Sequence, residues 1–336
     1  MIMWRLRGKG PIGRGDHMQD IRRVTVVGGG LIGASWCALF LVHGLEVVLH
    51  DVVPDAEARV REELQRIAPV LQSLGLVLDP QTPRLSFTLD LAEAVRHADA
   101  VQECGPERLA FKQALWAQVE RHCGPATLLM SSSSGITASM QSRRMNTPER
   151  MLIAHPFNPP HLIPLVELVP GRRTNAQAMA RAQVFFTGLG KRVVRLRKEI
   201  PGFVANRIQA AVIRESVSLV RQGVVSVEDL DVAVTQSLGL RWAVGGPFIS
   251  AHLGGGAGGI RAFWAQFATG LQLLWLHMRL KPVWLGRGAQ RELAEAVEKA
   301  YGERPVADLA MARDRQQNAV LGALRASRNT SEDGKA

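Results

Sequence analysis

The order of apolar and polar positions divides the chain into two parts. Up to about residue 200, short apolar runs alternate with segments of helical period. Strands are predicted at 24–27, 45–51, 98–104, 126–134, 151–156 and 191–197, and helices near 111–122 and 176–188. Alternating strands and helices indicate an α/β fold with a largely parallel, doubly wound sheet, in which ligands bind beyond the carboxyl ends of the strands.

Beyond Pro201 the strand signals disappear. Helical apolar periodicity covers residues 202–223 and 228–238, so a domain boundary is expected near 199–201. The apolar run at 263–278 contains two glutamines and a histidine and is shorter than the ~20 apolar residues that a membrane span needs. It is interpreted as a buried amphipathic helix. The glycines at 254–259 are interpreted as a flexible turn, because no strand precedes them.

Composition narrows the class of protein. The 336 residues suit two domains, and 46% hydrophobic with 21% charged residues is typical of a soluble globular protein. The net charge of +11 is spread along the chain without a nucleic-acid motif, so no nucleic-acid or membrane partner is expected. Three cysteines without metal-ligand spacing predict no metal site, and they suit a reducing cytoplasm.

A glycine motif follows the first predicted strand. Gly28, Gly30 and Gly33 have the G-x-G-x-x-G spacing and open a helical segment. The first glycine allows a tight turn, the second lets a pyrophosphate approach the backbone, and the third lets the helix pack against the sheet. The free N–H groups at the start of the helix favour phosphate binding. A dinucleotide site is therefore predicted here.

The choice of dinucleotide depends on Asp51. This residue ends the second predicted strand, 18 residues after Gly33. A carboxylate there accepts hydrogen bonds from both ribose hydroxyls of an adenosine and repels a 2′-phosphate. The expected cofactor is therefore NAD rather than NADP. The predicted organisation is a basic, disordered extension at 1–20, an NAD-binding Rossmann domain at 21–199, a helical domain for substrate and dimerisation at 200–325, and a disordered tail at 326–336.

A histidine follows the predicted strand at 151–156. His155 is framed by prolines, and Glu167 comes 12 residues later after a proline-rich turn. A carboxylate on one ring nitrogen fixes the tautomer of a histidine and makes it a better base for a hydroxyl proton. Ser134 lies at the end of another predicted strand and suits a hydrogen bond to a substrate oxygen. A helix cap or turn is an equally good interpretation of this serine.

These motifs together resemble the 3-hydroxyacyl-CoA dehydrogenase superfamily. The resemblance runs from about Arg23 to Phe248 and rests on "VVGGGLIGASW", "VQECGPERLAFK", "SSSSGI", "AHPFNPPHLIPLVELVPG", "KEIPGFVANRIQAA" and "GLGLRWAVGGPF". Within it, the chain is most similar to the branch of lambda-crystallin, L-gulonate 3-dehydrogenase and the carnitine dehydrogenases. The run of serines replaces Asn-Thr or Ser-Thr of the family. The segment beyond Phe248 is closer to the carnitine enzymes than to the gulonate enzymes, whereas "GFVANR" keeps an asparagine that is not expected in carnitine enzymes, so the subfamily stays open.

The resemblance implies roles for individual residues. His155 matches the catalytic base, Glu167 its carboxylate partner, and Ser134 and Asn206 the residues that hold the substrate. Positions that match NAD contacts are Leu31, Ile32, Asp51, Glu107 and Lys112. Glu107 and Lys112 could equally form a surface ion pair, and Asn206 could bridge helices. Arg241 is a candidate for binding a substrate carboxylate, with a helix cap as the alternative.

The expected activity is that of an NAD-dependent dehydrogenase that interconverts a 3-hydroxy and a 3-keto group on a small acid resembling L-gulonate or carnitine. An L-3-hydroxyacyl-CoA dehydrogenase of fatty-acid metabolism is the enzymatic alternative. A crystallin-like structural protein that only binds NAD is an alternative of another class. A homodimer is expected because all-helical second domains commonly bury an apolar face against a partner subunit.

Overall fold

The structure, a computed structural model, describes residues 21–333, so the extension expected at 1–20 lies outside the described residues. The chain divides into two compact units. The first contains the residues up to Asn206 together with those from Asp314 onward, and the second contains Arg207–Arg313. The predicted boundary at residues 199–201 thus precedes the division between the units by a few residues.

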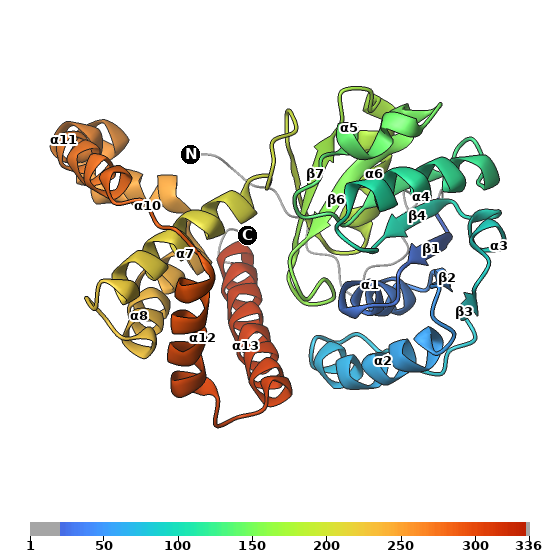
Figure 1. Cartoon of the computed structure of the whole chain (residues 1–336), viewed down its shortest axis with the longest axis horizontal. Helices are drawn as coiled ribbons and strands as arrows, with labels where there is room; N and C mark the ends of the chain where they lie inside the picture. Colours follow the sequence, from blue (N-terminus) through green and yellow to red (C-terminus); the bar gives the residue numbers. More distant parts are fainter. Residues whose placement is uncertain (1–20, 334–336) are drawn as a thin grey trace. The chain divides into compact units, whose positions relative to one another are not determined.

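The described residues of the first unit form an eight-stranded sheet (Figure 1). The strands lie in the order β3-β2-β1-β4-β5-β6-β7-β8. Their bounds are Arg23–Val27 (β1), Glu46–His50 (β2), Leu85–Thr88 (β3), Ala100–Glu103 (β4), Leu128–Ser131 (β5), Met151–Pro156 (β6), Leu165–Pro170 (β7) and Arg192–Arg195 (β8). The pairs from β3 to β6 are all parallel, as the alternation of strands and helices predicts.

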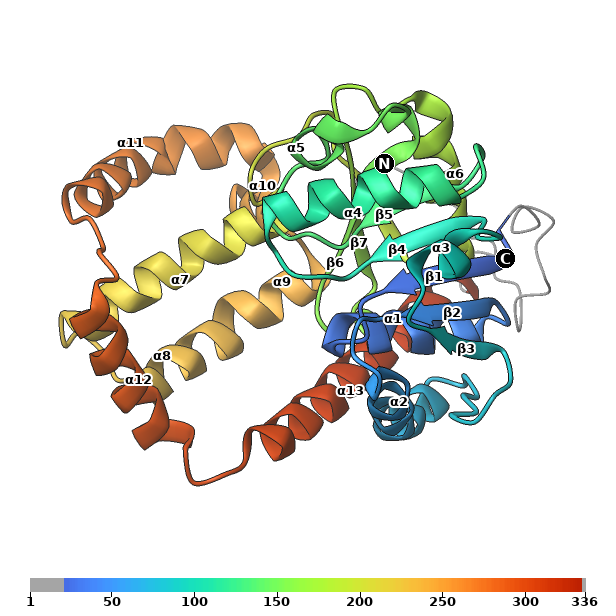
Figure 2. The ribbon, with the colours of Figure 1, turned by 45° about the vertical axis from the view of Figure 1, so that its right-hand side comes forward.

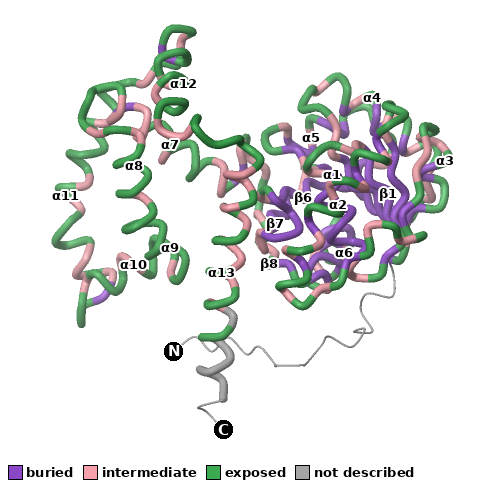
Figure 3. Tube along the Cα trace, turned by 90° about the horizontal axis from the view of Figure 1, so that it is seen from below, coloured by how far each residue is buried: buried purple, intermediate pink, exposed green. Residues whose placement is uncertain are grey.

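Helices cover both faces of this sheet. Their bounds are Leu31–Val42 (α1), Ala56–Ser73 (α2), Leu91–Val95 (α3), Leu109–His122 (α4), Ala138–Gln141 (α5) and Ala176–Gly188 (α6). One core cluster joins α1, α2 and α6 to the sheet, and a second joins α3, α4 and α5 to its other face. Figure 2 shows α4 over β4 and β5, and in Figure 3 the strands form the buried centre of the unit. The sheet is doubly wound, which confirms the predicted fold class.

β7 runs antiparallel to β6, whereas β8 is parallel to β7. The sequence pattern had not indicated β7 as a strand of its own. Only residues 157–164 connect β6 to β7, and a parallel connection needs a crossover of a dozen or more residues. The short proline-rich segment therefore sends the chain straight back beside β6, and this return determines which residues of the two strands face each other.

The second unit is helical, which confirms the predicted class of the C-terminal part. Its helices are α7 (Ala205–Arg221), α8 (Val227–Ala233), α9 (Leu240–Val244), α10 (Pro247–Gly254), α11 (Gly259–Leu280), α12 (Arg287–Tyr301) and the first part of α13 (Val306–Asp333). The single helix expected at 228–238 is interrupted, because α8 gives way to a π-helical segment, Val234–Gly239. The glycine-rich stretch at 254–259 contains a short 3-10 helix.

Two sequence interpretations need correction. The helix α11 is present, but it is not buried in the described chain, since Leu273, Trp275 and Leu280 are 63%, 54% and 72% exposed. α13 continues to Asp333, where an irregular tail was expected from residue 326. The tail sequence is polar, but it extends a helix that is already formed, and propagating a helix costs far less than nucleating one. No helix within the described part of the chain is long and apolar enough to cross a membrane.

Candidate active site

The glycine motif forms the turn from β1 into α1. Gly28 has φ +104°, and a Cβ there would lie 2.9 Å from the carbonyl oxygen of Cys104. A Cβ on Gly33 would lie 1.9 Å from the carbonyl oxygen of Gly28, so only glycine allows this close packing. At Gly30, by contrast, a Cβ would meet nothing within 4 Å. The middle glycine is thus not required by protein packing, and its open side suits the approach of a pyrophosphate.

A cavity of about 760 Å³ lies beside this turn, at the carboxyl ends of β1, β2 and β4. Gly28, Gly30, Asp51, Gly105 and Phe111 are among the residues that line it. Asp51 follows β2 directly, and its carboxylate accepts hydrogen bonds from the backbone N–H of Gly29 at 2.7 Å and of Val53 at 3.1 Å. These bonds orient the carboxylate at the cavity wall, where it can meet ribose hydroxyls. The size and chemistry of the cavity fit an adenosine.

The first residues of α1 differ in exposure. Leu31 is 59% exposed beside the glycine turn, whereas Ile32 is partly buried and packs against the core. Leu31 also lines a second cavity, which contains Gly30 and Asp51 as well. Leu31 therefore has an open side at this second cavity, which shares Gly30 and Asp51 with the first, whereas Ile32 packs against the core. The geometry of this end of the sheet fits NAD.

Glu107 and Lys112 belong to a polar network behind the serine-rich loop. The Lys112 ammonium is only 1% exposed, and it donates to both carboxylate oxygens of Glu103 at 2.7 and 2.8 Å. It also forms an ion pair with Glu107 at 3.3 Å. An interpretation of Glu107 and Lys112 as a surface pair is therefore wrong for the lysine. The ammonium neutralises a buried carboxylate, which would be costly to leave unpaired.

Glu107 ties this network to the loop that follows β5. Its Oε1 accepts hydrogen bonds from the Ser133 hydroxyl at 2.5 Å and from the N–H groups of Gly135 and Ile136 at 3.1 and 3.3 Å. Burial raises the pKa of Glu107, but these bonds and the Lys112 charge outweigh it and hold the pKa below its usual value. The carboxylate thus fixes the loop on both sides of Ser134.

His155 and Glu167 face each other on the antiparallel strands β6 and β7. The His155 Nδ1 lies 2.8 Å from Glu167 Oε2, and the two residues are only 3% and 1% exposed. The other nitrogen, Nε2, is therefore the one available to a reactant. The pairing predicted from the proline-rich turn is thus formed in the structure, and strand register produces it.

The segment that leads into α7 binds the second carboxylate oxygen of Glu167. Oε1 of Glu167 accepts hydrogen bonds from the N–H groups of Val204 and Ala205, both at 3.0 Å. Burial raises the pKa of Glu167, but the bonds from His155 and from this segment outweigh it, so that the pKa lies below its usual value. An ionised Glu167 stabilises a positive charge on His155, which a base acquires when it takes a proton.

Phe203 is a residue that sequence reasoning missed. It is fully buried, with φ +52°, a left-handed conformation that costs a bulky residue roughly 1–2 kcal/mol. Its ring centroid lies 5.3 Å from that of His155. The unusual backbone leads directly to the two N–H groups that bind Glu167. The preceding Pro201-Gly202 pair, in which Gly202 also has a positive φ, is the signal in the sequence that points to this turn.

Asn206 and Ser134 lie next to the histidine. The Asn206 Nδ2 is 3.4 Å from His155 Nε2 and donates to the backbone oxygen of Ser134 at 3.1 Å. Ser134 itself is an exposed residue. The structure therefore brings together Ser134, His155, Glu167 and Asn206, which come from four separate segments. The cluster thus places an imidazole that is paired with a carboxylate next to two polar residues.

Arg241 lies in a different part of the chain. It is an exposed residue of α9, in the second compact unit. Its backbone oxygen accepts a hydrogen bond from the Gly245 N–H at the end of that helix, and this contact involves no charge of the side chain. Arg241 therefore remains a candidate without a described contact to the cluster. Among the described residues no group of side chains could hold a metal ion.

Comparison with known proteins identifies the family. The model of the 3-hydroxyacyl-CoA dehydrogenase NAD-binding domain matches residues 23–200, and that of the C-terminal domain matches residues 202–304. L-carnitine dehydrogenase of Streptomyces coelicolor is 40% identical over 309 residues, which cover 91% of this chain and 95% of that protein. A 3-hydroxyacyl-CoA dehydrogenase of Gibberella moniliformis is 44% identical over 243 residues, or 71% and 74% of the two chains.

Solved structures show the same relationship. The crystal structure of 5-formyl-3-hydroxy-2-methylpyridine 4-carboxylic acid 5-dehydrogenase, an NAD⁺-dependent dismutase, has 30% sequence identity and a TM-score of 0.79. It covers 91% of this chain and 99% of its own. The family model of an NAD-binding domain agrees with the nucleotide cavity described above. The chain is an NAD-dependent dehydrogenase that acts on a CH–OH group, and it belongs to the 3-hydroxyacyl-CoA dehydrogenase family.

Proposed function

We propose that this dehydrogenase oxidises the 3-hydroxy group of a small free carboxylic acid of the L-carnitine type. The observation that carries the proposal is the cluster around His155 Nε2, where Asn206 and Ser134 surround a base that Glu167 supports. The names of the relatives support the substrate class, since the L-carnitine dehydrogenase of Streptomyces coelicolor aligns with 91% of this chain.

In the proposed reaction, His155 Nε2 takes the proton of the substrate hydroxyl. The Nδ1–H group donates to Glu167, whose negative charge favours the protonated ring. Asn206 and Ser134 hold the substrate oxygen while it changes from hydroxyl to carbonyl. Gly28, Gly30, Gly33, Leu31 and Asp51 would hold NAD, which would supply the acceptor for the hydride from the same carbon. Base catalysis of this kind typically contributes ~10²–10⁴-fold to the rate.

The second candidate is oxidation of an L-3-hydroxyacyl-CoA. It uses the same residues and the same proton transfer. The Gibberella moniliformis relative, which is 44% identical over 71% of this chain, supports it by its name. That alignment is shorter than those with the carnitine enzymes, so we place the free acid first.

For the free-acid substrate, we propose that Arg241 binds the carboxylate.

We further propose that the protein is a cytoplasmic homodimer. The support for the dimer is the helical unit, where large apolar side chains such as Trp275 and Leu273 are exposed in the single chain. The cytoplasmic location is supported by the cysteines. Cys37, Cys104 and Cys123 are all free thiols, as is usual in a reducing compartment.

The test is NADH formation with L-carnitine, L-gulonate, L-3-hydroxybutyrate and L-3-hydroxybutyryl-CoA. His155→Ala is measured beside the wild type, with His97→Ala, which changes an exposed histidine, as the matched control. We expect turnover of L-carnitine that falls at least ~10²-fold in His155→Ala and is unchanged in His97→Ala. Binding of NAD by the variant, measured by fluorescence quenching, should remain.

Each alternative has its own result. Turnover of the CoA ester alone would replace the free acid by the acyl-CoA reaction. Turnover of L-gulonate alone would move the substrate to the sugar acids. Full activity in His155→Ala would contradict the proposed base, whichever substrate is used.

A further inference from the structure

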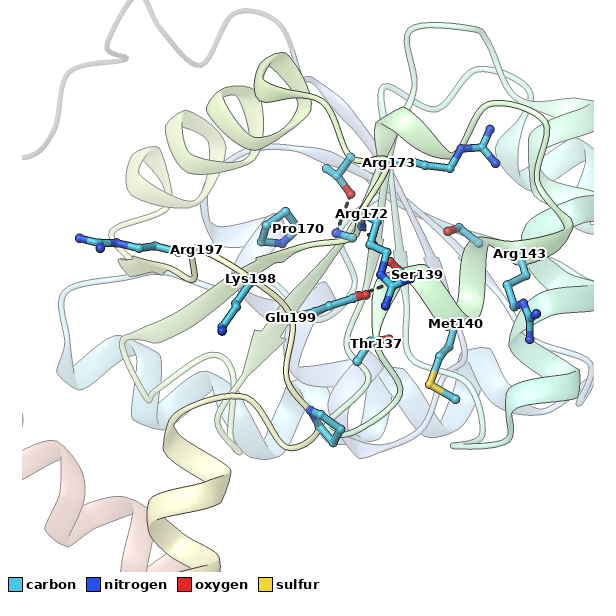
Figure 4. Close-up of a pocket in the computed structure, with 14 residues that line it drawn as sticks. Thr137, Ser139, Met140, Arg143, Pro170, Arg172, Arg173, Arg197, Lys198 and Glu199 are labelled. Atoms are coloured by element: carbon cyan, nitrogen blue, oxygen red, sulfur yellow. Dashed lines mark hydrogen bonds between the residues drawn. The ribbon is translucent and has the colours of Figure 1, made fainter.

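A large cavity of about 1140 Å³ lies in the first unit, away from the residues that line the nucleotide cavity. Three segments build its wall: residues 137–143 in and after α5, residues 170–174 at the end of β7, and residues 197–201 after β8. Figure 4 shows these segments around a common hollow. The cavity shares no lining residue with the cavity beside Gly30 and Asp51. The reaction proposed above leaves it without a role.

The wall of this cavity is strongly cationic. Its charged residues are Arg143, Arg172, Arg173, Arg197, Lys198 and Glu199. Five positively charged residues and one carboxylate thus line the cavity. Within the part of the chain that the structure describes, none of the five forms an ion pair with an acidic residue. A concave wall with charges of one sign concentrates their field and attracts ions of the opposite sign.

The single carboxylate does not neutralise these charges. Oε2 of Glu199 accepts a hydrogen bond from the backbone N–H of Ser139 at 3.1 Å. The Ser139 hydroxyl in turn accepts from the backbone N–H of Arg172 at 2.8 Å. In each bond a backbone N–H donates to a side-chain oxygen, and the two bonds together join the three segments without using the guanidinium of Arg172. The cavity wall is therefore held in place by contacts that do not use its cationic groups.

Arg172 occupies the middle of the wall. Figure 4 shows its side chain running toward Ser139 and Glu199, whereas Arg173 and Arg197 point outward at the rim. A guanidinium presents paired N–H donors whose geometry matches the oxygens of a phosphate group. The hydroxyl-bearing residues Thr137 and Ser142 line the same hollow. This combination is the chemistry that recognises a phosphate, and the volume is sufficient for more than one phosphate group.

We propose that this cavity binds a small anion that carries phosphate groups, at a site separate from the NAD site. Arg172 contacts the phosphate oxygens, and the other four cations add long-range attraction. Glu199 opposes the anion by its charge. The proposal does not depend on which 3-hydroxy acid the enzyme oxidises.

The test uses sodium pyrophosphate, titrated by calorimetry into the protein saturated with NAD. Saturation is essential because the glycine turn also attracts phosphate, and NAD blocks that turn. We compare the wild type with Arg172→Glu, Glu199→Gln and the control Arg96→Glu. Arg96 is an exposed residue outside the cavity, and its replacement makes the same change in net charge. Thermal unfolding without ligand verifies that each variant is folded.

We expect one saturable site in the wild type, with affinity that falls as salt is added. Arg172→Glu should weaken binding at least about tenfold, whereas Arg96→Glu leaves it nearly unchanged. Glu199→Gln should strengthen binding, because it removes the opposing charge and keeps an oxygen for the Ser139 N–H. The opposite signs at Arg172 and Glu199 distinguish a local site from a general loss of fold.

Three results would overturn the proposal. The first is no saturable binding of pyrophosphate to the NAD-saturated wild type. The second is equal weakening in Arg172→Glu and Arg96→Glu, which would show that net charge alone attracts the anion. The third is binding of a short DNA duplex that competes fully with pyrophosphate and is far tighter, which would make the surface a nucleic-acid site.

Discussion

At the scale of single residues, Glu167 combines two tasks. One carboxylate oxygen holds the Nδ1 of His155, and the other holds the N–H groups of Val204 and Ala205. The same side chain therefore holds the proposed base and anchors the segment that carries Asn206. Because Phe203 covers the histidine with its ring, this anchoring also fixes the apolar side of the imidazole.

Replacing Glu167 by Gln should separate the two tasks. Gln keeps an oxygen for one partner but has no negative charge, so we expect kcat to fall by roughly ten- to a hundredfold with a small change in KM. Steady-state kinetics with the best substrate measures this, and Glu46→Gln, at an exposed position, is the control. A kcat equal to that of the wild type would show that the charge of Glu167 does not assist the base.

The same carboxylate predicts a dependence of stability on pH. The pKa of Glu167 lies below its ordinary value of 4.5 in the folded protein. Its contribution to stability is therefore present above pH 4.5 and is lost as the pH falls through the folded pKa. Urea unfolding at a series of acidic pH values should show a smaller loss of stability in Glu167→Gln than in the wild type. Parallel curves for the two proteins would contradict this linkage.

Asp51 is the residue that should govern cofactor choice. Its carboxylate repels a 2′-phosphate, whereas an amide does not. Asp51→Asn keeps an acceptor for the Gly29 N–H and should weaken NAD binding while reducing the preference for NAD over NADP. Dissociation constants for both dinucleotides measure the effect, with Asp79→Asn, at an exposed position, for comparison. An unchanged preference would mean that other groups exclude NADP.

At the scale of elements, the loop between β6 and β7 is held by Lys191. This residue precedes β8, is 5% exposed, and donates from Nζ to the carbonyl oxygens of Pro160 and Ile163. Its ammonium also lies 5.6 Å from the ring centroid of Trp36 in α1. The loop joins the strands that carry His155 and Glu167, so the bonds of Lys191 to its carbonyl groups stabilise the connection between these strands.

Lys191→Met should therefore lower both stability and kcat. Met fills a similar volume but cannot bind the two carbonyl groups, which would be left without donors in a buried place. Burial lowers the pKa of Lys191 from 10.5 to about 7. Between these two values the unfolded chain binds more protons than the folded one, so this group makes stability increase as pH rises from about 7 to 10.5.

Chemical unfolding across this pH range measures the prediction. Stability should increase less steeply with pH in Lys191→Met than in the wild type, because the contribution of Lys191 is missing. Lys198→Met, at an exposed position, should show the same increase of stability with pH as the wild type. An identical slope in the wild type and Lys191→Met would mean that the lysine is not the group that titrates.

At the scale of the whole molecule, the helical unit predicts association. Leu273, Leu274, Trp275 and Leu276 are consecutive residues of α11, and each is more than half exposed, at 63%, 52%, 54% and 51%. Exposed apolar surface of this extent is typical of an interface with another chain. We expect light scattering to give the mass of a dimer.

Trp275→Asp should shift this equilibrium toward the monomer, because it places a charge within the apolar surface. Ala294→Asp, at an exposed position in α12, makes the same change of charge and should leave the mass unchanged. A monomeric wild type at micromolar concentration would reject the dimer.

Features that depend on neighbouring residues were predictable from the sequence. Contacts between segments that are distant in the sequence were harder to predict. The spacing of Gly28, Gly30 and Gly33 directly predicts a turn, because its conformation depends on neighbouring residues. The burial of Lys112 against Glu103 was not predictable, since that pair forms only when α4 packs on β4. The exposure of α11 was interpreted wrongly, because an apolar pattern does not tell which surface covers it. The proximity of His155 and Glu167 was predictable, because a proline-rich turn between them could fold the second segment back beside the first strand.

The division of the chain into two units has a consequence for how such an enzyme changes over evolutionary time. Every group proposed to handle the proton, from Ser134 to Asn206, belongs to the first unit, which ends its first segment at Asn206. Sequence change within Arg207–Arg313 can therefore accumulate without altering the acid–base groups. A lineage of this kind is free to acquire new substrates through drift in one part while the reaction itself is inherited intact.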